Sequence, residues 1–440
     1  MMGELNQMLD IHPITDGFKE TEVGVIPEDW DICELQTAVD FLDGQRRPIK
    51  SGDRAKISGL YPYYGASGIV DYVNDYIFDD DLILLGEDGE NILSRNLPLA
   101  FMVSGKIWVN NHAHVMKPKD SFDITYLTEY LESIDYSLLN SGTAQPKLNK
   151  QACLKIKVIK PSKKEQTAIA KVLSDADALI TKIEQLIAKK QAIKTATMQQ
   201  LLSGRTRLPP FAKHPNGTFK GYRQNEQGVL PEDWGIVSVA DVLSEISMGP
   251  FGSDIKVSNF TKTGIPVLSG LNVNSSKLID SFKNFVTEEK AKELKKAVAS
   301  RGDVIVTHRG TIGQISYIPD NSKFEKYVIS QSQFRARFKK EINPAWVVLY
   351  FLSPKGSSSL LEGKGHTGVP AIAQATTTFR KLQFPCPSNE EQTAITNILS
   401  DMDAELATLE KKLAKLRDIK QGMMRQLLTG RIRLPLDQQP

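Results

Sequence analysis

Basic, aromatic and amide side chains gather in the first third of the sequence, and together they suit contact with DNA. A basic stretch at 46–56 precedes a glycine-rich aromatic run at 61–68, and the segment 110–114 reads Asn-Asn-His-Ala-His. Basic groups interleaved with aromatic and amide side chains combine phosphate anchoring with readout of base edges. We therefore predict the following DNA contacts in this region: Arg46, Arg47, Lys50, Tyr64, His112 and His114.

Two glycine-rich stretches further along carry a second set of candidates. Segment 249–253 reads Gly-Pro-Phe-Gly-Ser, and segment 307–313 reads Thr-His-Arg-Gly-Thr-Ile-Gly. These glycines lack the spacing of a dinucleotide-binding fingerprint, so they indicate tight loops. Basic groups beside such loops could face a phosphate or a guanine, although Arg309 fits a structural role in the turn equally well. The candidates here are Ser253, Lys256, His308 and Arg309.

No set of residues in the sequence indicates catalysis. There is no Gly-x-x-x-x-Gly-Lys-[Ser/Thr] loop, and no Asn or Asp followed by Pro-Pro and an aromatic residue, the signature of amino-methylating enzymes. Asp320 and Glu362 only superficially resemble a nuclease carboxylate set, because they lie far apart. His112 and His114 have no cysteine or carboxylate at ligand spacing, which favours hydrogen bonding within a sheet over metal binding. We expect no catalytic, cofactor-binding or metal-binding residue.

The elements that must position these candidates are repeated within the chain. The heptapeptide Gly-Val-Ile-Pro-Glu-Asp-Trp at 24–30 returns as Gly-Val-Leu-Pro-Glu-Asp-Trp at 228–234. A longer block, 161–209, returns at 387–435 with 26 of 49 residues identical. The segments between these repeats show almost no mutual resemblance. A repeated framework around unlike inserts predicts a scaffold of approximate two-fold symmetry that displays two different surfaces.

The longer repeat predicts two long helices, at 165–203 and 391–429. Proline and serine precede each helix and glycine follows it, as expected at helix boundaries. Apolar residues recur every seven positions along two seams, a pattern typical of a coiled coil, although Lys190, Lys194 and Lys420 also fall on the seams. Each helix would be ~58 Å long. We expect the two helices to pair antiparallel, the alternative being one helix of a globular bundle.

Short basic segments follow both predicted helices, Gly-Arg-Thr-Arg-Leu-Pro at 204–209 and Gly-Arg-Ile-Arg-Leu-Pro at 430–435. Arginine near a helix C-terminus is favoured by the helix dipole. Capping of the helix is therefore a better explanation of these arginines than direct contact with DNA.

The composition fits a soluble protein of two or three domains. The chain has 440 residues, a net charge of +3 and a pI of about 8.4, which permits local basic patches without demonstrating them. No apolar run approaches the ~18 residues that span a bilayer, and no secretory signal is visible at the start. Three isolated cysteines form neither a disulfide framework nor a zinc site. We expect a cytoplasmic location without membrane contact.

Taken together, these motifs closely resemble the specificity subunit of a type I restriction–modification enzyme, over essentially the whole chain. The resemblance rests on the repeated heptapeptide and on Pro-Ser-x-x-Glu-Gln-x-x-Ile before a long helix that ends in Gln-Leu-Leu-[Ser/Thr]-Gly. It also rests on Ser-Gly-Thr-Ala-Gln-Pro-Lys-Leu-Asn at 141–149 and on Gly-Pro-Phe-Gly-Ser at 249–253. The second insert closes with Gly-Val-Pro-Ala-Ile at 368–372 instead, so the two inserts look like different subtypes.

The resemblance implies a non-catalytic subunit whose two target-recognition domains each read half of a bipartite site in double-stranded DNA. It implies partners as well: two methyltransferase subunits that use S-adenosylmethionine to methylate adenine, and motor-nuclease subunits that add restriction in phage defence. The implied fold is α+β, with two α/β globular domains separated by two long antiparallel coiled-coil helices. The expected division is residues 1–160, first recognition domain; 161–209, first spacer helix; 210–386, second recognition domain; and 387–440, second spacer helix and tail.

Two other classes of protein remain as alternatives. A stand-alone DNA-binding regulator would also combine basic loops with a coiled coil, but it would usually be a homodimer with identical DNA-reading domains. A fused restriction enzyme would carry methylase or nuclease motifs in the same chain, and those motifs are absent. Solubility of the chain with and without methyltransferase subunits would separate the three classes.

Overall fold

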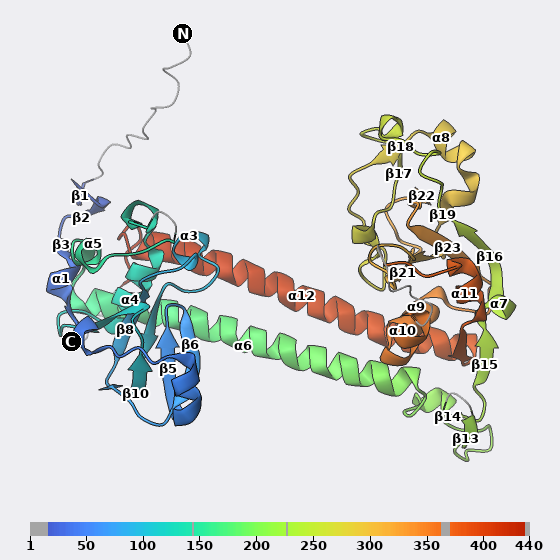
Figure 1. Ribbon diagram of the computed structural model, residues 1–440, viewed down its shortest axis with the longest axis horizontal. Coiled ribbons are helices and arrows are strands. Elements are labelled where there is room, and N and C mark those ends of the chain that lie inside the picture. The colour runs from blue at the N-terminus through green and yellow to red at the C-terminus, as the bar shows by residue number, and fades with distance from the viewer. Residues whose placement is uncertain (1–15, 143–144, 226–227, 362–369, 436–440) are drawn as a thin grey trace, which may run out of the picture. The chain divides into compact units, whose positions relative to one another are not determined.

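The computed structural model describes residues 16–142, 145–225, 228–361 and 370–435. Contacts divide the chain into two compact units: unit 1 comprises Met1–Leu186 and Glu410–Pro440, and unit 2 comprises Ile187–Leu409. Both long helices, α6 (Lys163–Leu202) and α12 (Asn389–Leu427), contribute a segment to each unit (Figure 1). These bounds lie within two residues of the predicted ones.

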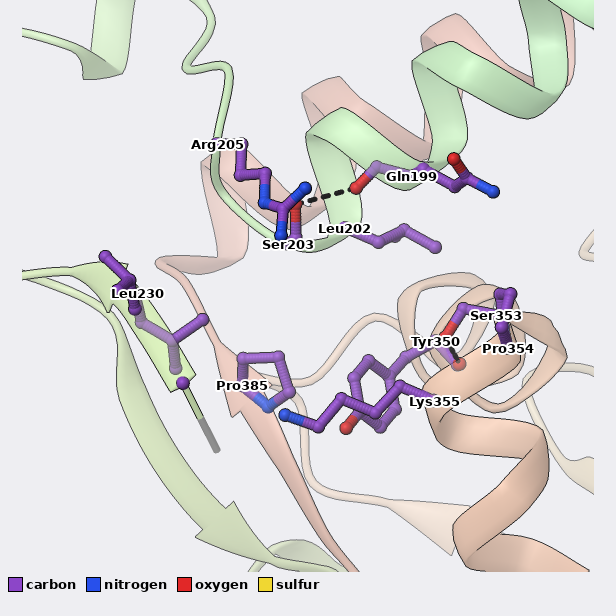
Figure 2. A pocket seen from close by; sticks show the side chains of 12 residues that line it. Gln199, Leu202, Ser203, Arg205, Leu230, Tyr350, Ser353, Pro354, Lys355 and Pro385 are labelled. Carbon is purple, nitrogen blue, oxygen red and sulfur yellow. Dashed lines mark hydrogen bonds between the residues drawn. The ribbon is translucent and has the colours of Figure 1, made fainter. Parts of the chain in front are cut away.

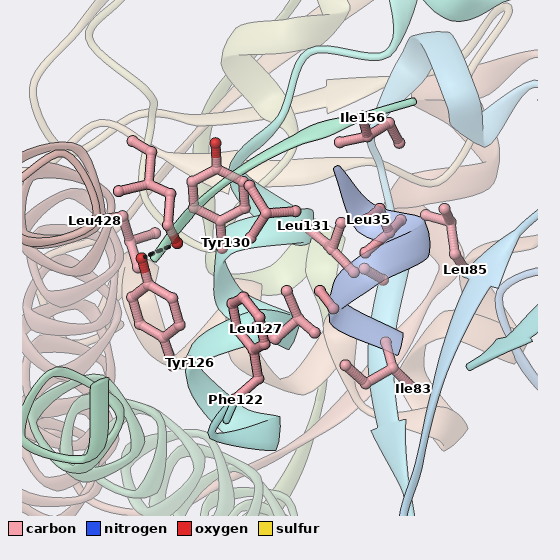
Figure 3. Packing of buried hydrophobic residues seen from close by; sticks show 14 of the residues in the cluster. Leu35, Ile83, Leu85, Phe122, Tyr126, Leu127, Tyr130, Leu131, Ile156 and Leu428 are labelled. Carbon is pink, nitrogen blue, oxygen red and sulfur yellow. Dashed lines mark hydrogen bonds between the residues drawn. The ribbon is translucent and has the colours of Figure 1, made fainter. Parts of the chain in front are cut away.

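Unit 1 is built on an antiparallel sheet with the strand order β4-β11-β8-β9. Helix α4 (Ile124–Ser133) packs on this sheet, and its start is fixed by Asp123, whose side chain accepts from the N–H groups of Thr125 and Tyr126. In Figure 3 the side chain of Leu131 meets Leu35 in the buried cluster. The strands are β4 (Val39–Phe41), β11 (Ala113–Pro118), β8 (Leu82–Gly86) and β9 (Ala100–Val103).

Unit 2 contains a sheet of the same topology, with the order β16-β23-β20-β21 and antiparallel pairing throughout. Helix α9 (Pro344–Leu352) follows β23 as α4 follows β11, and Asn343 caps it by accepting from the N–H of Ala345. The strands are β16 (Leu243–Met248), β23 (Gln333–Phe338), β20 (Val304–Thr307) and β21 (Ile315–Tyr317).

The two inserts therefore share a scaffold, although their sequences show almost no resemblance. The pattern of strand, turn and helix over residues 111–130 is repeated residue for residue over 331–350, a shift of 220. Few side chains are identical, because a half-buried sheet accepts many combinations of apolar residues on its inner face. The two inserts are thus unlike in sequence, as expected, while their central sheets share one topology.

The inserts differ in what is attached to the shared sheet. Unit 1 adds a second sheet, β6-β5-β10-β7, over a small apolar cluster that includes Ile107 and Val115. Its strands are β5 (Ser58–Gly65), β6 (Gly68–Val73), β7 (Phe78–Asp79) and β10 (Lys106–Val109). Unit 2 instead adds two short strand pairs and a helix over its own apolar cluster: β17 (Ile265–Pro266), β18 (Phe285–Val286), β19 (Val298–Ser300), β22 (Lys326–Val328) and α8 (Glu288–Glu293).

The helix segments run antiparallel within each unit, as cross-helix ion pairs show. In unit 2, Lys194 pairs with Asp403, while Lys190 Nζ lies 2.8 Å from Glu405. In unit 1, Lys420 Nζ lies 2.7 Å from Asp177, and Arg417 lies 2.6 Å from Glu184. The residue numbers rise on one helix as they fall on the other, which confirms the predicted direction. The seam lysines thus hold acidic partners across the pair, a role that can fix the register of a coiled coil.

The repeated motifs meet in one joint per unit. In unit 1, Trp30 Nε1 donates to Glu165 at 3.3 Å, and Arg433 donates to Glu165 at 2.9 Å and to Asp29 at 3.0 Å. The heptapeptide, the start of α6 and the segment after α12 are therefore tied together. Glu165 also completes a reciprocal capping box with Ser162.

Unit 2 forms the same joint from the other copies. Trp234 Nε1 donates to Glu391 at 3.0 Å, while Arg207 donates to Glu391 and Asp233, both at 2.7 Å. The second arginine of each basic exit thus serves an ion pair rather than a helix cap, so the capping explanation is corrected for these two residues. Gly204 has φ +68°, and a Cβ there would lie 2.5 Å from Pro231, which explains why the helix ends in glycine.

Candidate nucleic-acid interface

In unit 1 the central strand β8 runs into segment 86–89, whose backbone is held from two sides. The N–H of Glu87 donates to the carbonyl of His112 at 2.8 Å, and the carbonyl of Glu87 accepts from Leu148 at 2.7 Å. Gly89 adopts φ +109°, a conformation that glycine reaches without strain. The turn is therefore fixed by backbone contacts that do not involve the side chains of Glu87 and Asp88.

In unit 2 strand β20 runs into segment 307–310 with the same contacts. The N–H of His308 donates to Ser332 at 2.9 Å, and its carbonyl accepts from Ile372 at 2.9 Å. Gly310 adopts φ +82°. One backbone arrangement thus carries an acidic pair in unit 1 and the pair His308-Arg309 in unit 2.

Two of the predicted contacts, Arg46 and His114, lie in a charged network beneath segment 86–89. Arg46 donates to Glu87 and to the carbonyl of Ala113, both at 2.7 Å. His114 is 1% exposed, and its two ring nitrogens lie 2.8 Å from Asp43 and 3.0 Å from the carbonyl of Leu148. Both side chains are committed to the fold, so neither belongs to the contact set that we propose below.

The network keeps its charges in the folded state. Burial opposes a charge on His114, but the hydrogen bonds and electrostatic interactions with Asp43 and Cys153 together outweigh burial and raise the pKa of the imidazole to about 10. Burial would raise the pKa of Asp43, yet the contacts with His114 and Val115 lower it. A protonated imidazole donates from both nitrogens, which matches the carboxylate and carbonyl that it meets.

The other candidates in unit 1 lie nearer the surface. Arg47 and Lys50 are exposed, and the carbonyl of Arg47 accepts from Trp108 Nε1 at 2.6 Å. Tyr64 is half-buried in β5, and burial raises the pKa of its hydroxyl. His112 is 50% exposed and its Nδ1 lies 2.8 Å from Asp88. Any test of His112 as a DNA contact therefore has to examine Asp88 as well, because the two side chains are paired.

In unit 2 segment 249–252 and the pair His308-Arg309 line one cavity of 1010 Å³. Arg309 is exposed there, and it forms no ion pair with the residues that the structure describes. Burial lowers the pKa of His308, so its imidazole is neutral at pH 7. Because His308 Nε2 lies 3.3 Å from the carbonyl of Gln331, Nε2 carries the proton and Nδ1 remains an acceptor.

The remaining two candidates of unit 2 do not line this cavity. Ser253 and Lys256 are exposed on the chain that follows segment 249–252. They are neighbours of the cavity in sequence, since Asp254 between them lines it. Their contact with DNA stays a prediction.

Sequence reasoning missed three cations of the cavity, Lys295, Lys296 and Arg380. All three are exposed, and none forms an ion pair among the described residues. By contrast, two of the three cavity carboxylates are paired, Glu245 with Arg335 and Glu293 with Lys290 at 2.7 Å, while Asp254 accepts from the N–H of Phe251 at 3.0 Å. The four cations outnumber this one carboxylate without a cation partner. The cavity therefore presents unpaired positive charge, which suits phosphate groups. In the sequence, Lys295 and Lys296 lie in a charged stretch that looks like a solvated helix face, so their place in a cavity could not be predicted.

A second cavity of unit 2 has a different character. It has a volume of 270 Å³ and lies where α6 ends, between Leu202 and Leu230 on one side and Tyr350 on the other (Figure 2). Ser203 donates to the carbonyl of Gln199 at 2.7 Å along its edge. None of the predicted DNA contacts lines it, so it is not part of the candidate interface.

The described residues also bear on metal binding and on membrane spanning. No group of three or more histidine, cysteine, aspartate or glutamate side chains there could hold a metal ion. Within the same residues, no helix combines the length and apolar character needed to cross a membrane.

Comparison with known proteins places the chain in a family. The family model of the type I restriction modification DNA specificity domain matches residues 27–195 and 231–418. The MjaVIII specificity subunit of a type I restriction enzyme from Methanocaldococcus jannaschii is 28% identical over 95% of this chain and 96% of that protein. The putative MjaX specificity subunit of the same organism is 25% identical over 95% of this chain and 97% of its own length.

A solved structure supports the fold. The S subunit of a type I restriction–modification system from M. genitalium matches with a TM-score of 0.56 and 14% identity, covering 90% of this chain and 96% of that one. The doubled family match spans both frameworks and both inserts. This chain therefore belongs to the family of type I restriction–modification DNA specificity subunits.

Proposed function

We propose that the chain reads a bipartite site in double-stranded DNA, with the insert of one unit on each half-site, and that it catalyses nothing itself. The observation that carries this proposal is one sheet built twice with different chemistry at the same segment, Glu87-Asp88 in one unit and His308-Arg309 in the other. A scaffold that is kept while its exposed side chains change suits two unlike half-sites. Base edges in the major groove supply the differences that such side chains read.

The contact set that we propose is drawn from groups that are exposed or half-buried. In unit 1 it comprises Arg47, Lys50, Tyr64 and His112; in unit 2 it comprises Ser253, Lys256, His308 and Arg309, together with Lys295, Lys296 and Arg380. The lysines of this set, with Arg47 and Arg380, would hold phosphates, while His308 and Arg309 lie at the segment that differs between the units.

The helices would separate the two readers and dock two methyltransferase subunits, which would bind S-adenosylmethionine and methylate one adenine per half-site. Leu179 and Leu186 of α6 support a docking role: they stand seven residues apart and are 43% and 39% exposed. An apolar pair on one helix face, left open to water, suits a protein partner. Motor-nuclease subunits would add restriction to this cytoplasmic complex. The proposal also includes the division of the chain into two recognition domains and two spacer segments, with boundaries after residues 160, 209 and 386.

The proposed site has an unread gap of fixed length. If both inserts read major grooves on one DNA face, their centres lie about one turn apart, roughly 34–36 Å or 10 base pairs. Half-sites of three to five bases then leave a gap of about five to eight bases. Inserting one heptad into α6 would move one reader by ~10 Å, or about three base pairs.

The test is co-expression with methyltransferase subunits, followed by sequencing of methylated DNA from the cells. We expect adenine methylation in a two-part motif with one gap length, and none when this chain is omitted. A continuous motif would contradict the proposal. A chain that binds DNA as a homodimer and needs no methyltransferase would favour a stand-alone regulator, and activity of the chain alone would favour a fused restriction enzyme.

A further inference from the structure

The residues Asp88 and Arg309 occupy the same position in the two units. Each follows a residue whose N–H and carbonyl are both hydrogen-bonded to the backbone of neighbouring segments, and each precedes a glycine of positive φ. Each also forms an isolated antiparallel bridge, Asp88 with Lys147 and Arg309 with Ala371. The two side chains therefore leave equivalent points on equivalent sheets, and they carry opposite charges.

The surroundings of Arg309 indicate what this position faces. Its cavity also contains Lys295, Lys296 and Arg380, three cations without ion-pair partners in the described part of the chain. Cations arranged in this way suit a DNA backbone, which brings base edges within reach of the same surface. Arg309 has no carboxylate partner and can direct its paired donors to a guanine.

The charge of Asp88 limits what it can do at the equivalent position. A carboxylate only accepts hydrogen bonds and is repelled by phosphates, so contact with the backbone is excluded. A base with an exocyclic amino group is the partner that remains, and cytosine N4 is the usual one for a carboxylate. Asp88 is held in place, since both of its oxygens lie 2.8–3.0 Å from His112 Nδ1. Its side chain remains 20% exposed.

We propose that this shared position reads a base in each half-site: Arg309 donates to O6 and N7 of a guanine, and Asp88 accepts from the amino group of a cytosine. The proposal rests on the proposed function and adds to it the residue that sets one base on each side. His112, a member of the contact set, would in addition orient the Asp88 carboxylate as a positioning residue. One substitution should then change one base of one half-site and leave the other half-site unchanged.

The experiment uses the complex with methyltransferase subunits and reads its methylated motif by sequencing. Asp88→Asn should broaden one position of one half-site, with discrimination reduced about 5- to 150-fold, because the amide can donate as well as accept. Arg309→Gln should broaden one position of the other half-site. Asp120→Asn and Lys262→Gln serve as matched controls, since both residues are exposed in the same units and neither belongs to either segment.

Each outcome decides the proposal. Broadening confined to one base supports it, as does a shifted preference at the same base in Asp88→Glu, which keeps the charge and moves the carboxylate. An unchanged motif in both Asp88→Asn and Arg309→Gln overturns it. Loss of methylation at both half-sites in Asp88→Asn also counts against it, because a base contact predicts an intact second half-site. If the unsubstituted complex fails to methylate DNA, the proposed function itself is wrong.

Discussion

Replacing Lys420 tests whether the seam lysines hold the helices through buried charge. Lys420 is 17% exposed at its side chain and lies 3.0 Å from Glu129 and 2.7 Å from Asp177. Burial opposes the charge on Lys420, but these two carboxylates raise its pKa. Burial raises the pKa of Glu129, and the charge of Lys420 counteracts part of that rise. Lys420→Met would leave Glu129, 13% exposed, as a carboxylate without its cation.

The magnitude follows from the two partners separately. Removing one member of a buried pair costs about 3–5 kcal/mol, whereas an exposed partner such as Asp177, at 45%, regains water and adds little. Glu129 limits the loss by taking up a proton, so we expect about 3 kcal/mol of unfolding free energy at pH 7. Below about pH 4.5 the carboxyl is protonated in both states and the cost disappears. Above that pH the carboxyl of Glu129 ionises freely only in the unfolded chain. The variant therefore loses stability as the pH rises.

Unit 2 supplies the matched control. Lys194 is the repeat equivalent of Lys420 and pairs with Asp403, but Leu349 stands where unit 1 has Glu129. Lys194→Met should therefore cost only about 0–1 kcal/mol. The double variant Lys420→Met with Glu129→Leu should recover most of the loss.

The assay is urea unfolding followed by circular dichroism at pH 5 and pH 7, with hydrogen exchange of α4 as a local probe. Equal losses for the Lys420 and Lys194 variants, or a loss that does not grow with pH, would refute the reasoning.

Three further predictions follow. His114→Gln should cost about 3 kcal/mol by stranding Asp43; because the folded pKa of about 10 exceeds the ordinary 6.5, the wild-type contribution is present below pH 6.5 and is lost as the pH rises towards 10, which urea unfolding at pH 6, 8 and 9.5 would measure. Alanine at Lys295, Lys296 and Arg380 should reduce the slope of log affinity against log salt by about 2.7 in the assembled complex, whereas alanine at the exposed Lys262, Lys283 and Lys326 should leave it unchanged; equal slopes for both sets would remove these cations from the interface. Leu179→Lys and Leu186→Lys should weaken co-purification of methyltransferase subunits while helix content by circular dichroism is unchanged, and undiminished co-purification would contradict docking on that face.

The framework was predictable because its signals are local and repeated. Proline, serine and glycine mark the ends of α6 and α12, and the observed bounds lie within two residues of the expected ones. The reason for the repeated Asp-Trp and Glu-Gln pairs was not predictable. It depends on contacts across 135 to 404 residues, such as Trp30 with Glu165 and Arg433 with Asp29.

The shared sheet escaped sequence comparison because its physical requirements are loose. Tyr126 and Trp346 fill equivalent buried positions with different rings, and Asp123 and Asn343 cap equivalent helices with different groups. For the candidate site, residue type could not separate exposed from buried members. His112 and His114 are two residues apart, a spacing that would place both on one face of a single strand. Strand β11 begins only at Ala113, so His112 lies in the turn before it and reaches solvent, whereas His114 is buried.

Exchange of one insert tests the central claim most directly, namely that one framework carries two independent DNA readers. Residues 235–376 would be replaced by the corresponding segment of another specificity subunit, and the methylated motif of the assembled complex would be sequenced. We predict a new second half-site, with the first half-site and the gap length retained. Simultaneous change of both half-sites would contradict the account.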